Sequence, residues 1–400
     1  MSARFLAIAT ILLSGIAFFP NISTLSGQDE QHDVHSQAVS EDHSQPASGE
    51  QTDSHSAEAD GHAEAGDEEF NPSEYIMEHV KDSHDWHILT KKDGHHVSVP
   101  LPVIVYSKHS GLHAFSSSKI AHGHSHNGFQ MGHGSILVEN RKGESVEKSL
   151  DGKIVEVDEH GEMLEAGLPL DFSITKNVFM MMLSVIVLLI VFLSLAKSYK
   201  KAGVSEPKGL MGFIEPVIVF IEEDVALPNI GEENYARFMP YLLTIFFFIL
   251  INNLMGLIPF FPFGANVTGN IAVTFVLATC TFFVTQFSSN KAYWGHIFNT
   301  PGVPKLLAPI MIPVEIIGLF TKPFALMIRL FANITAGHII ILSLVSLIFV
   351  FKSIFLAVPS LIMVLFMDCI ELLVAFLQAY IFTLLSALFI GMAMPEHHHD

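Results

Sequence analysis

Residues 322–338 read KPFALMIRLFANITAGH, and this stretch lies in the part of the chain that decides the fold. It belongs to the first of two apolar runs, Leu306–Phe351 and Ile354–Met394, each about 40 residues long. A helix needs only about 20 apolar residues to cross a bilayer upright. We therefore predict a hairpin of two long, strongly tilted membrane helices. Prolines mark candidate kinks in the first helix and a candidate start of the second: Pro309, Pro313, Pro323 and Pro359.

Three more apolar spans precede this hairpin, at Val178–Ala196, about Pro240–Phe261 and about Ile271–Phe287. The sequence thus predicts an all-α polytopic membrane protein with about five crossings. Lysines follow the first span, which places its end in the cytoplasm and the N-terminus outside, so that the C-terminus is cytoplasmic. The segment Leu210–Val225 carries four acidic residues on an apolar helical pattern and is predicted to lie along the cytoplasmic face.

The N-terminal part has a different composition. The chain carries a formal net charge of −19, and Arg4 is the only basic side chain between Ser2 and Val80. Residues 1–27 are predicted to be a secretion signal, with an uncleaved anchor as the alternative. Residues 28–75 are predicted to be a disordered acidic, His-rich segment. Residues 76–170 are predicted to form a small exported β-rich domain, and 171–396 the membrane domain. Its predicted strands are Trp86–Thr90, Val97–Ser107 and Lys153–Val157, with a hairpin turn at Asp93-Gly94.

Few charges occur between Leu306 and Met394. They are Glu315, Lys322, Arg329, Lys352, Asp368 and Glu371, joined by the titratable His338. An arginine in mid-helix costs roughly 2.5–3.5 kcal/mol on insertion scales, so such residues usually face a partner, an aqueous cavity or an ion path.

Helical spacing sorts these residues into stripes. Glu315, Lys322 and Arg329 are seven apart, and Asn333 follows one turn later. His338 lies about 13 Å further along the axis than Arg329 and about half a turn round, so it faces a different cavity. Asp368, Glu371, Ala375 and Gln378 form a stripe on the last helix.

Proton transfer suits these side chains, because histidine titrates near neutral pH and burial can raise a carboxylate into that range. Arginine keeps its charge throughout. The pattern predicts two aqueous access paths separated by a permanent cation. Structural pairing is the alternative for all of these residues, as is snorkelling for Glu315, Lys322 and Asp368. Asn252 and Asn253 either line a wet path or bond between helices.

The stretch 322–338 closely resembles the motif of the F-type ATP synthase subunit a family, whose core reads Arg-Leu-Phe, a small residue and Asn. Further resemblance lies in Asn253 to Pro259 and in Glu371 with Gln378, and it covers about residues 172–394. The resemblance implies a subunit that translocates protons and has no catalytic site or cofactor of its own. Its partners would be the c-ring, the b subunits and the rest of the complex in a bacterial inner membrane, and nucleic acid would not be among them.

The resemblance also implies roles for individual residues. Arg329 would meet the ion-binding carboxylate of each c subunit and prevent a proton short circuit. The proton path would include His338, Glu371, Gln378, Asn333 and Asn253, with Glu315 toward the other half-channel. Many relatives have glutamate where His338 stands and histidine where Glu371 stands. Whether protons or sodium ions are carried stays open.

Two other classes of function compete. Seventeen of the 22 histidines precede the first span, and His122, His124 and His126 are candidate zinc or copper ligands. A metal-ion transporter would use them to collect metal, but an intramembrane arginine repels cations. The alternative for the histidines is a solvated tail without a specific metal. A non-transporting scaffold would leave Arg329, His338 and Glu371 without a role.

Overall fold

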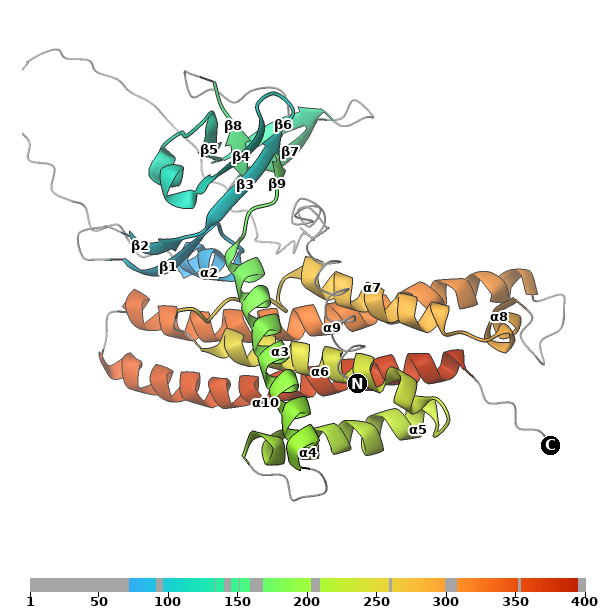
Figure 1. The fold of residues 1–400 in the computed structure, drawn as a ribbon. Coiled ribbons are helices and arrows are strands. Elements are labelled where there is room, and N and C mark those ends of the chain that lie inside the picture. The colour runs from blue at the N-terminus through green and yellow to red at the C-terminus, as the bar shows by residue number, and fades with distance from the viewer. Residues whose placement is uncertain are drawn as a thin grey trace, which may run out of the picture.

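The computed structural model of the chain describes residues 72–90, 96–132, 134–139, 145–150, 152–158, 168–202, 209–258, 261–298, 308–351 and 354–394. They form a small β-rich part that stands on one end of a larger helical bundle (Figure 1). The predicted signal 1–27, nearly all of the acidic segment 28–75 and the Asp93-Gly94 turn lie outside these residues.

The β-rich part follows a short helix, α2 (Pro72–Val80). Its three-stranded sheet has the order β4-β3-β9, in which β3 (Pro102–Ser107) pairs antiparallel with β4 (Gly111–Ser116) and β9 (Leu170–Asp171). The other described sheets are two-stranded and pair β1 (Asp85–Thr90) with β2 (His96–Pro100), β5 (Phe129–Met131) with β8 (Ile154–Glu156), and β6 (Ser135–Glu139) with β7 (Ser145–Ser149). Burial alternates along β3, because successive side chains point to opposite faces of a strand. The small core that results contains Val103, Val105, Phe115, Ile120, Phe129 and Ile154.

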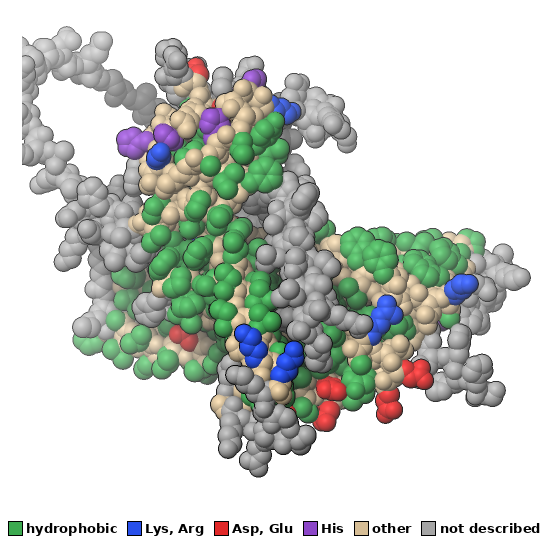
Figure 2. Space-filling model, viewed as in Figure 1, with side chains coloured by type: hydrophobic (Ala, Val, Ile, Leu, Met, Phe, Trp, Pro, Cys, Tyr) green, Lys and Arg blue, Asp and Glu red, His purple; other side chains and the backbone are tan. Residues whose placement is uncertain are grey.

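The first long helix, α3 (Lys176–Ala202), leads from the β-rich part across the other long helices of the bundle (Figure 1). Its side chains are apolar over most of its length, and basic side chains gather at the end away from the β-rich part (Figure 2). Lys197 and Lys200 are exposed in its last turns. This is the charge asymmetry from which the sequence predicts the β-rich part outside, and that orientation stays a prediction.

A buried central helix, α6 (Tyr235–Leu257), organises the bundle. Every residue from Phe238 to Ile249 is buried, as expected for a helix that is apolar on all sides. α6 packs against α3 and α10 (Ile354–Ala393), while α9 (Ala308–Phe351) packs between α10 and α7 (Ile271–Phe287). The hairpin of α9 and α10 lies steeply across α3 (Figure 1).

Four described helices are long and apolar enough to cross a membrane, and a fifth span is possible if α7 and α8 (Lys291–Phe298), bent by 102°, count as one. α9 and α10 expose many large apolar side chains, which is typical of helices that face lipid. The predicted fold class, a polytopic helical membrane protein with a small β-rich part, is confirmed. That the β-rich part is exported stays a prediction.

The helix predicted over Leu210–Val225 is interrupted, and three elements occupy residues 210–230. They are α4 (Leu210–Phe220), a π-helical turn η4 (Ile221–Ala226) and α5 (Leu227–Ile230). The last of these approaches α10 so closely that a Cβ on Gly391 would collide with the backbone carbonyl of Asn229. A glycine at this position is therefore required for the contact.

Most predicted helix boundaries agree with the observed ones within a few residues. One prediction is wrong: Pro359 does not begin the last helix but lies inside α10, which starts at Ile354. A proline near a helix end leaves few backbone groups unpaired, and membrane helices tolerate it. The elements not anticipated were α2, α8 and the strands β4, β5, β6, β7 and β9, which are short and carry weak sequence patterns.

Candidate functional site

Arg329 lies on the exposed face of α9, and among the described residues no ion-pair partner for it is found. A neighbouring face of the same helix is buried through Leu326, Leu330 and Ile334. Three of the residues beside Arg329 on the exposed face are small, namely Ala325, Ala332 and Ala336. Small side chains let another helix approach closely, so this face suits a helical partner in the membrane.

A narrow polar cavity lies behind this face, inside the bundle. It is lined by the end of α6, the α6–α7 loop, and the facing sides of α9 and α10. The polar lining residues are Asn252, Asn253, Asn266, Thr268, His338 and Glu371. The cavity has room for about one water molecule.

Among the described residues that line this cavity, the titratable ones are His338 of α9 and Glu371 of α10. His338 Nδ1 lies 3.7 Å from Glu371 Oε1, which is longer than a hydrogen bond. Glu371 is 5% exposed. Gly337 permits this approach, because a Cβ at that position would stand 3.1 Å from Glu371 Oε1.

Asn253 ties three elements together around the cavity. Its Nδ2 donates to the carbonyl of Ala375 on α10 at 3.2 Å, and its Oδ1 accepts from Thr268 Oγ1 at 2.5 Å. Thr335 of α9 in turn donates to the carbonyl of Gly269 at 3.3 Å. The two bonds to the α6–α7 loop hold its residues against α6 and α9.

Several buried polar atoms that line the cavity have no hydrogen-bond partner in the described part of the chain. They are Asn252 Oδ1, Asn266 Nδ2 and Glu371 Oε2. An unpaired buried polar group costs roughly 1–3 kcal/mol. A structure that leaves three such atoms around one cavity is suited to water there rather than to a dry core.

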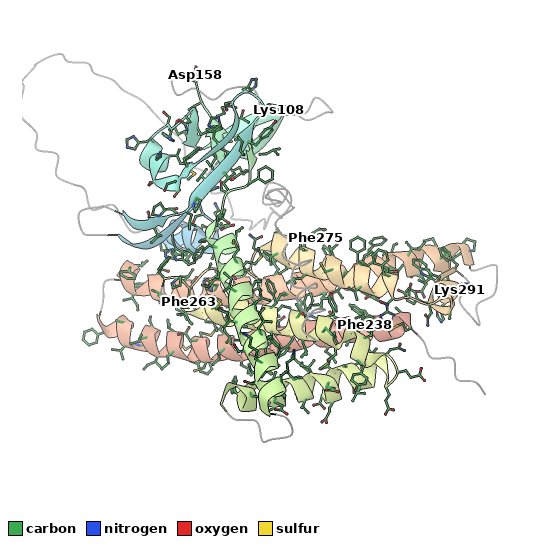
Figure 3. The ribbon with its side chains drawn as sticks, viewed as in Figure 1. Lys108, Asp158, Phe238, Phe263, Phe275 and Lys291 are labelled. Atoms are coloured by element: carbon green, nitrogen blue, oxygen red, sulfur yellow. The ribbon has the colours of Figure 1, made fainter. Side chains whose placement is uncertain are left out.

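A second cavity lies at the other end of the bundle, near the bend between α7 and α8. Figure 3 labels Lys291 at this end and Phe263, in the α6–α7 loop, at the end that carries the β-rich part. The second cavity includes Gln286, Tyr293 and Lys322 among its lining residues, and Lys322 Nζ lies 5.9 Å from the ring centroid of Phe389.

Lys322 and His338 are separated from Arg329 by about 10 Å and about 13 Å along the axis of α9.

The remaining predicted residues fall in several places. Gln378 is buried on α10, three residues beyond Ala375 of the first cavity. Asn333 is exposed one turn after Arg329, and Glu315 is half-buried near the start of α9.

The predicted stripe on α10 is only partly correct. Glu371, Ala375 and Gln378 are buried, whereas Asp368 is exposed. The difference arises because α10 turns its 371–375–378 side toward α6 and α9, and a residue at the margin of that side falls outside the contact. Asp368 is therefore no part of the first cavity.

The candidate metal ligands do not converge in the described part of the chain, where no group of three or more His, Cys, Asp or Glu side chains could hold a metal ion. His124 is exposed, and Nε2 of the half-buried His126 lies 3.4 Å from Lys119 Nζ. The side chain of His122 is outside the described residues. The metal hypothesis stays a prediction.

Sequence reasoning missed several lining residues. Asn266 and Thr268 lie in the loop between the second and third predicted spans, where the sequence predicts no site residue, and Gly337 lies inside the quoted stretch without a predicted role. The sequence signal that could have found Asn266 and Thr268 is the presence of polar side chains in a loop that joins two membrane spans. No pattern indicated that Gln286 and Tyr293 would meet Lys322.

Comparison with known proteins adds two family matches. The model of the ATP synthase A chain family matches residues 178–391, and that of a domain of unknown function, DUF8433, matches residues 75–172. The chain is 52% identical over 235 residues to ATP synthase subunit a of Chloroherpeton thalassium, which covers 57% of this chain and 69% of that protein.

Other relatives of the chain carry the same name, ATP synthase subunit a. Identity to ATP synthase subunit a 2 of Chlorobaculum tepidum is 53% over 238 residues, covering 58% of this chain and 66% of that protein. Identity to ATP synthase subunit a of Chlorobium phaeobacteroides strain DSM 266 is 43% over 303 residues, covering 73% and 86%.

Proposed function

The chain belongs to the ATP synthase A chain family, and from this premise we propose that it is the proton-translocating membrane subunit of an F-type ATP synthase. In this proposal it lies in a bacterial inner membrane as a multi-pass protein, with the β-rich part outside and the C-terminus in the cytoplasm. It catalyses no chemistry on ATP itself. It couples proton flow to the rotation of a ring of c subunits.

The observation that carries the proposal is the position of Arg329. This cation stands on an exposed helix face, at a level of α9 between a cavity that touches His338 and one that touches Lys322. A charge exposed on a membrane helix is costly unless a partner or water stabilises it. A carboxylate carried past this face by a c subunit would supply that partner. The small residues Ala325, Ala332 and Ala336 let the passing helix come close.

The first cavity serves as the path on the outer side. Its loop residues belong to the same end of the bundle as the β-rich part (Figures 1 and 3). A proton that enters there is taken up by the His338 and Glu371 pair, with Asn253 and Gln378 holding the neighbouring backbone and polar surface. It then passes to the carboxylate of a c subunit, which becomes neutral and can turn through lipid.

The second cavity serves as the path on the inner side, with Glu315 toward it. When the protonated c subunit completes its turn, it releases its proton to this side, and Arg329 stabilises the carboxylate left behind. Arginine retains its own proton at any physiological pH, so it separates the two paths. Each charge that crosses 100 mV supplies about 2.3 kcal/mol, so several protons are needed for each ATP.

The test is to replace Arg329 with alanine and to measure ATP-driven proton pumping in inverted vesicles that contain the assembled complex. Pumping should disappear while the amount of assembled complex is unchanged. Arg237→Ala is the matched control, because Arg237 is an exposed arginine at the start of α6, away from both cavities. Wild-type pumping by Arg329→Ala would reject the proposal in favour of a transporter or a scaffold.

A further inference from the structure

The β-rich part is joined to the membrane bundle by a dense set of contacts, which we call the junction. It comprises residues 79–86, between α2 and β1, and residues 171–179, between β9 and the first turn of α3. Backbone and side-chain bonds connect the two segments. The amide of Lys176 donates to the carbonyl of Ser83 at 3.0 Å, and Lys176 Nζ donates to the carbonyl of His79 at 3.1 Å.

Asp82 caps α3 from a distant part of the chain. One of its oxygens accepts the amide of Asn177 at 3.1 Å, and the other accepts Thr175 Oγ1 at 2.8 Å. The first amides of a helix have no partner within the helix, and a carboxylate there also interacts favourably with the helix dipole. The start of α3 is thus held by the exported part. His84 adds a second link, since its Nε2 lies 2.7 Å from Asp171 Oδ2.

Trp86 extends the junction into the membrane bundle. It is 7% exposed and belongs to the same apolar core as α3 and α6. Its ring packs edge-on against Phe179 of α3, with centroids 5.9 Å apart, and against Phe261 of the α6–α7 loop, with centroids 5.5 Å apart. Aromatic pairs of this kind contribute beyond the area that they bury.

The loop that Trp86 contacts also forms a wall of the first cavity. Residues 265–268 of this loop line the cavity beside His338 and Glu371, and Thr268 is bonded to Asn253. Furthermore, α2 packs against α9, the helix that carries His338. The exported part therefore touches two of the elements that build the cavity.

From these contacts we propose that the exported domain positions the outer wall of the first cavity: Asp82 fixes the start of α3, and Trp86 holds the α6–α7 loop in place through Phe261. This gives a role to the segment that matches a domain of unknown function. The proposal rests on the proposed function, because it assigns the domain to the proton path on the outer side. Trp86 and Asp82 are positioning residues that contact no proton carrier themselves.

The first test does not depend on proton transport. Hydrogen exchange of residues 261–270 is compared in the assembled complex of wild type, Trp86→Ala and Trp86→Phe. Loss of the ring should make these amides exchange about tenfold faster, because local opening becomes easier, and phenylalanine should restore much of the protection. The matched control is Leu112→Ala, which removes an apolar side chain that is 68% exposed on β4, away from the junction. Unchanged exchange in Trp86→Ala would overturn the proposal.

The second test measures ATP-driven pumping by the same variants and by Asp82→Asn. Trp86→Ala and Asp82→Asn should each pump several-fold more slowly at equal amounts of assembled complex, and Leu112→Ala should pump normally. Faster loop exchange with wild-type pumping would show that the domain holds the loop without serving transport, which contradicts the proposal. If Arg329→Ala pumps normally, the proposed function fails, and the exchange data still report whether the domain holds the loop.

Discussion

The described residues include two pairs of a histidine and a carboxylate that are largely shielded from solvent, one in the junction and one in the membrane bundle. In the junction, His84 Nε2 and Asp171 Oδ2 are 2.7 Å apart. The second oxygen of Asp171 accepts the amide of Ser173 at 2.8 Å, so both oxygens are bonded. In the membrane, His338 Nδ1 and Glu371 Oε1 are 3.7 Å apart, and Glu371 Oε2 has no partner in the described part of the chain.

The difference separates a structural pair from one that can exchange protons. A carboxylate whose oxygens are both bonded is held in one geometry and one protonation state. A carboxylate with a free oxygen beside a polar cavity can bind water and pass a proton onward. Under the proposed function, the same residue types serve two purposes, and the distance and bonding around them decide which.

The largest effect should come from removing the loosely held carboxylate. Glu371→Gln keeps the shape of the side chain but cannot release a proton, so ATP-driven pumping should fall on the order of 100-fold. Pumping and the amount of assembled complex are measured together. The matched control is Asp368→Asn on the same helix, whose exposed carboxylate lies outside the cavity and whose loss should leave pumping near wild type. If Glu371→Gln and Asp368→Asn lose equal amounts of pumping, the cavity carboxylate has no special role, which contradicts the prediction.

A smaller effect should follow from disturbing the geometry of the membrane pair. In Gly337→Ala the new Cβ would stand 3.1 Å from Glu371 Oε1 and 3.2 Å from its carboxyl carbon, so the side chain must shift. Pumping should fall about tenfold, because displacement of a proton carrier by about 1 Å is costly. Gly318→Ala on the same helix is the control, since its Cβ would meet nothing within 4 Å. Both variants replace a helical glycine with alanine, so the effect of helix propensity on stability is the same in both and cancels in the comparison.

The smallest effect concerns the junction pair and pH. Burial disfavours the charged form of His84, but the hydrogen bond and charge of Asp171 outweigh it and raise the pKa of His84 above its usual value. Burial also acts on Asp171, yet the bond from His84 keeps the pKa of Asp171 below its usual value. The pair therefore stabilises the domain fully below the unfolded pKa of histidine, about 6.5, and this contribution is lost as pH rises through the folded pKa.

The expected result is that the exported part of the assembled complex becomes easier to digest with protease as pH rises from about 6 to about 8. Burial raises the pKa of the Asp82 carboxyl above its usual value, so any titration of Asp82 must be subtracted with a variant that keeps it. His84→Gln measured at each pH gives the baseline. If the protease resistance of the wild type changes with pH in the same way as that of His84→Gln, the His84 and Asp171 pair carries no charge, which contradicts the prediction.

The sequence predicted the helices better than the site. Long apolar runs such as those of α9 and α10 predict membrane helices directly, and the charges inside them pointed to Arg329, His338 and Glu371. Spacing along one helix could not tell that Asp368 is exposed while Glu371 is buried, because that depends on where α6 and α9 pack. Asn266 and Thr268 reach the cavity only through the fold of a loop. The junction joins Asp82 to Thr175 across 93 positions, a contact that no local pattern reveals.

The most direct test of the account is the passive proton leak of vesicles that contain Arg329→Ala, measured as the collapse of an imposed pH gradient without ATP. The account predicts a faster collapse than in wild type, because the two cavities lose the cation between them, and a slower collapse again when Glu371→Gln is added. Vesicles of Arg329→Ala that hold the gradient as well as wild type and still pump would contradict it.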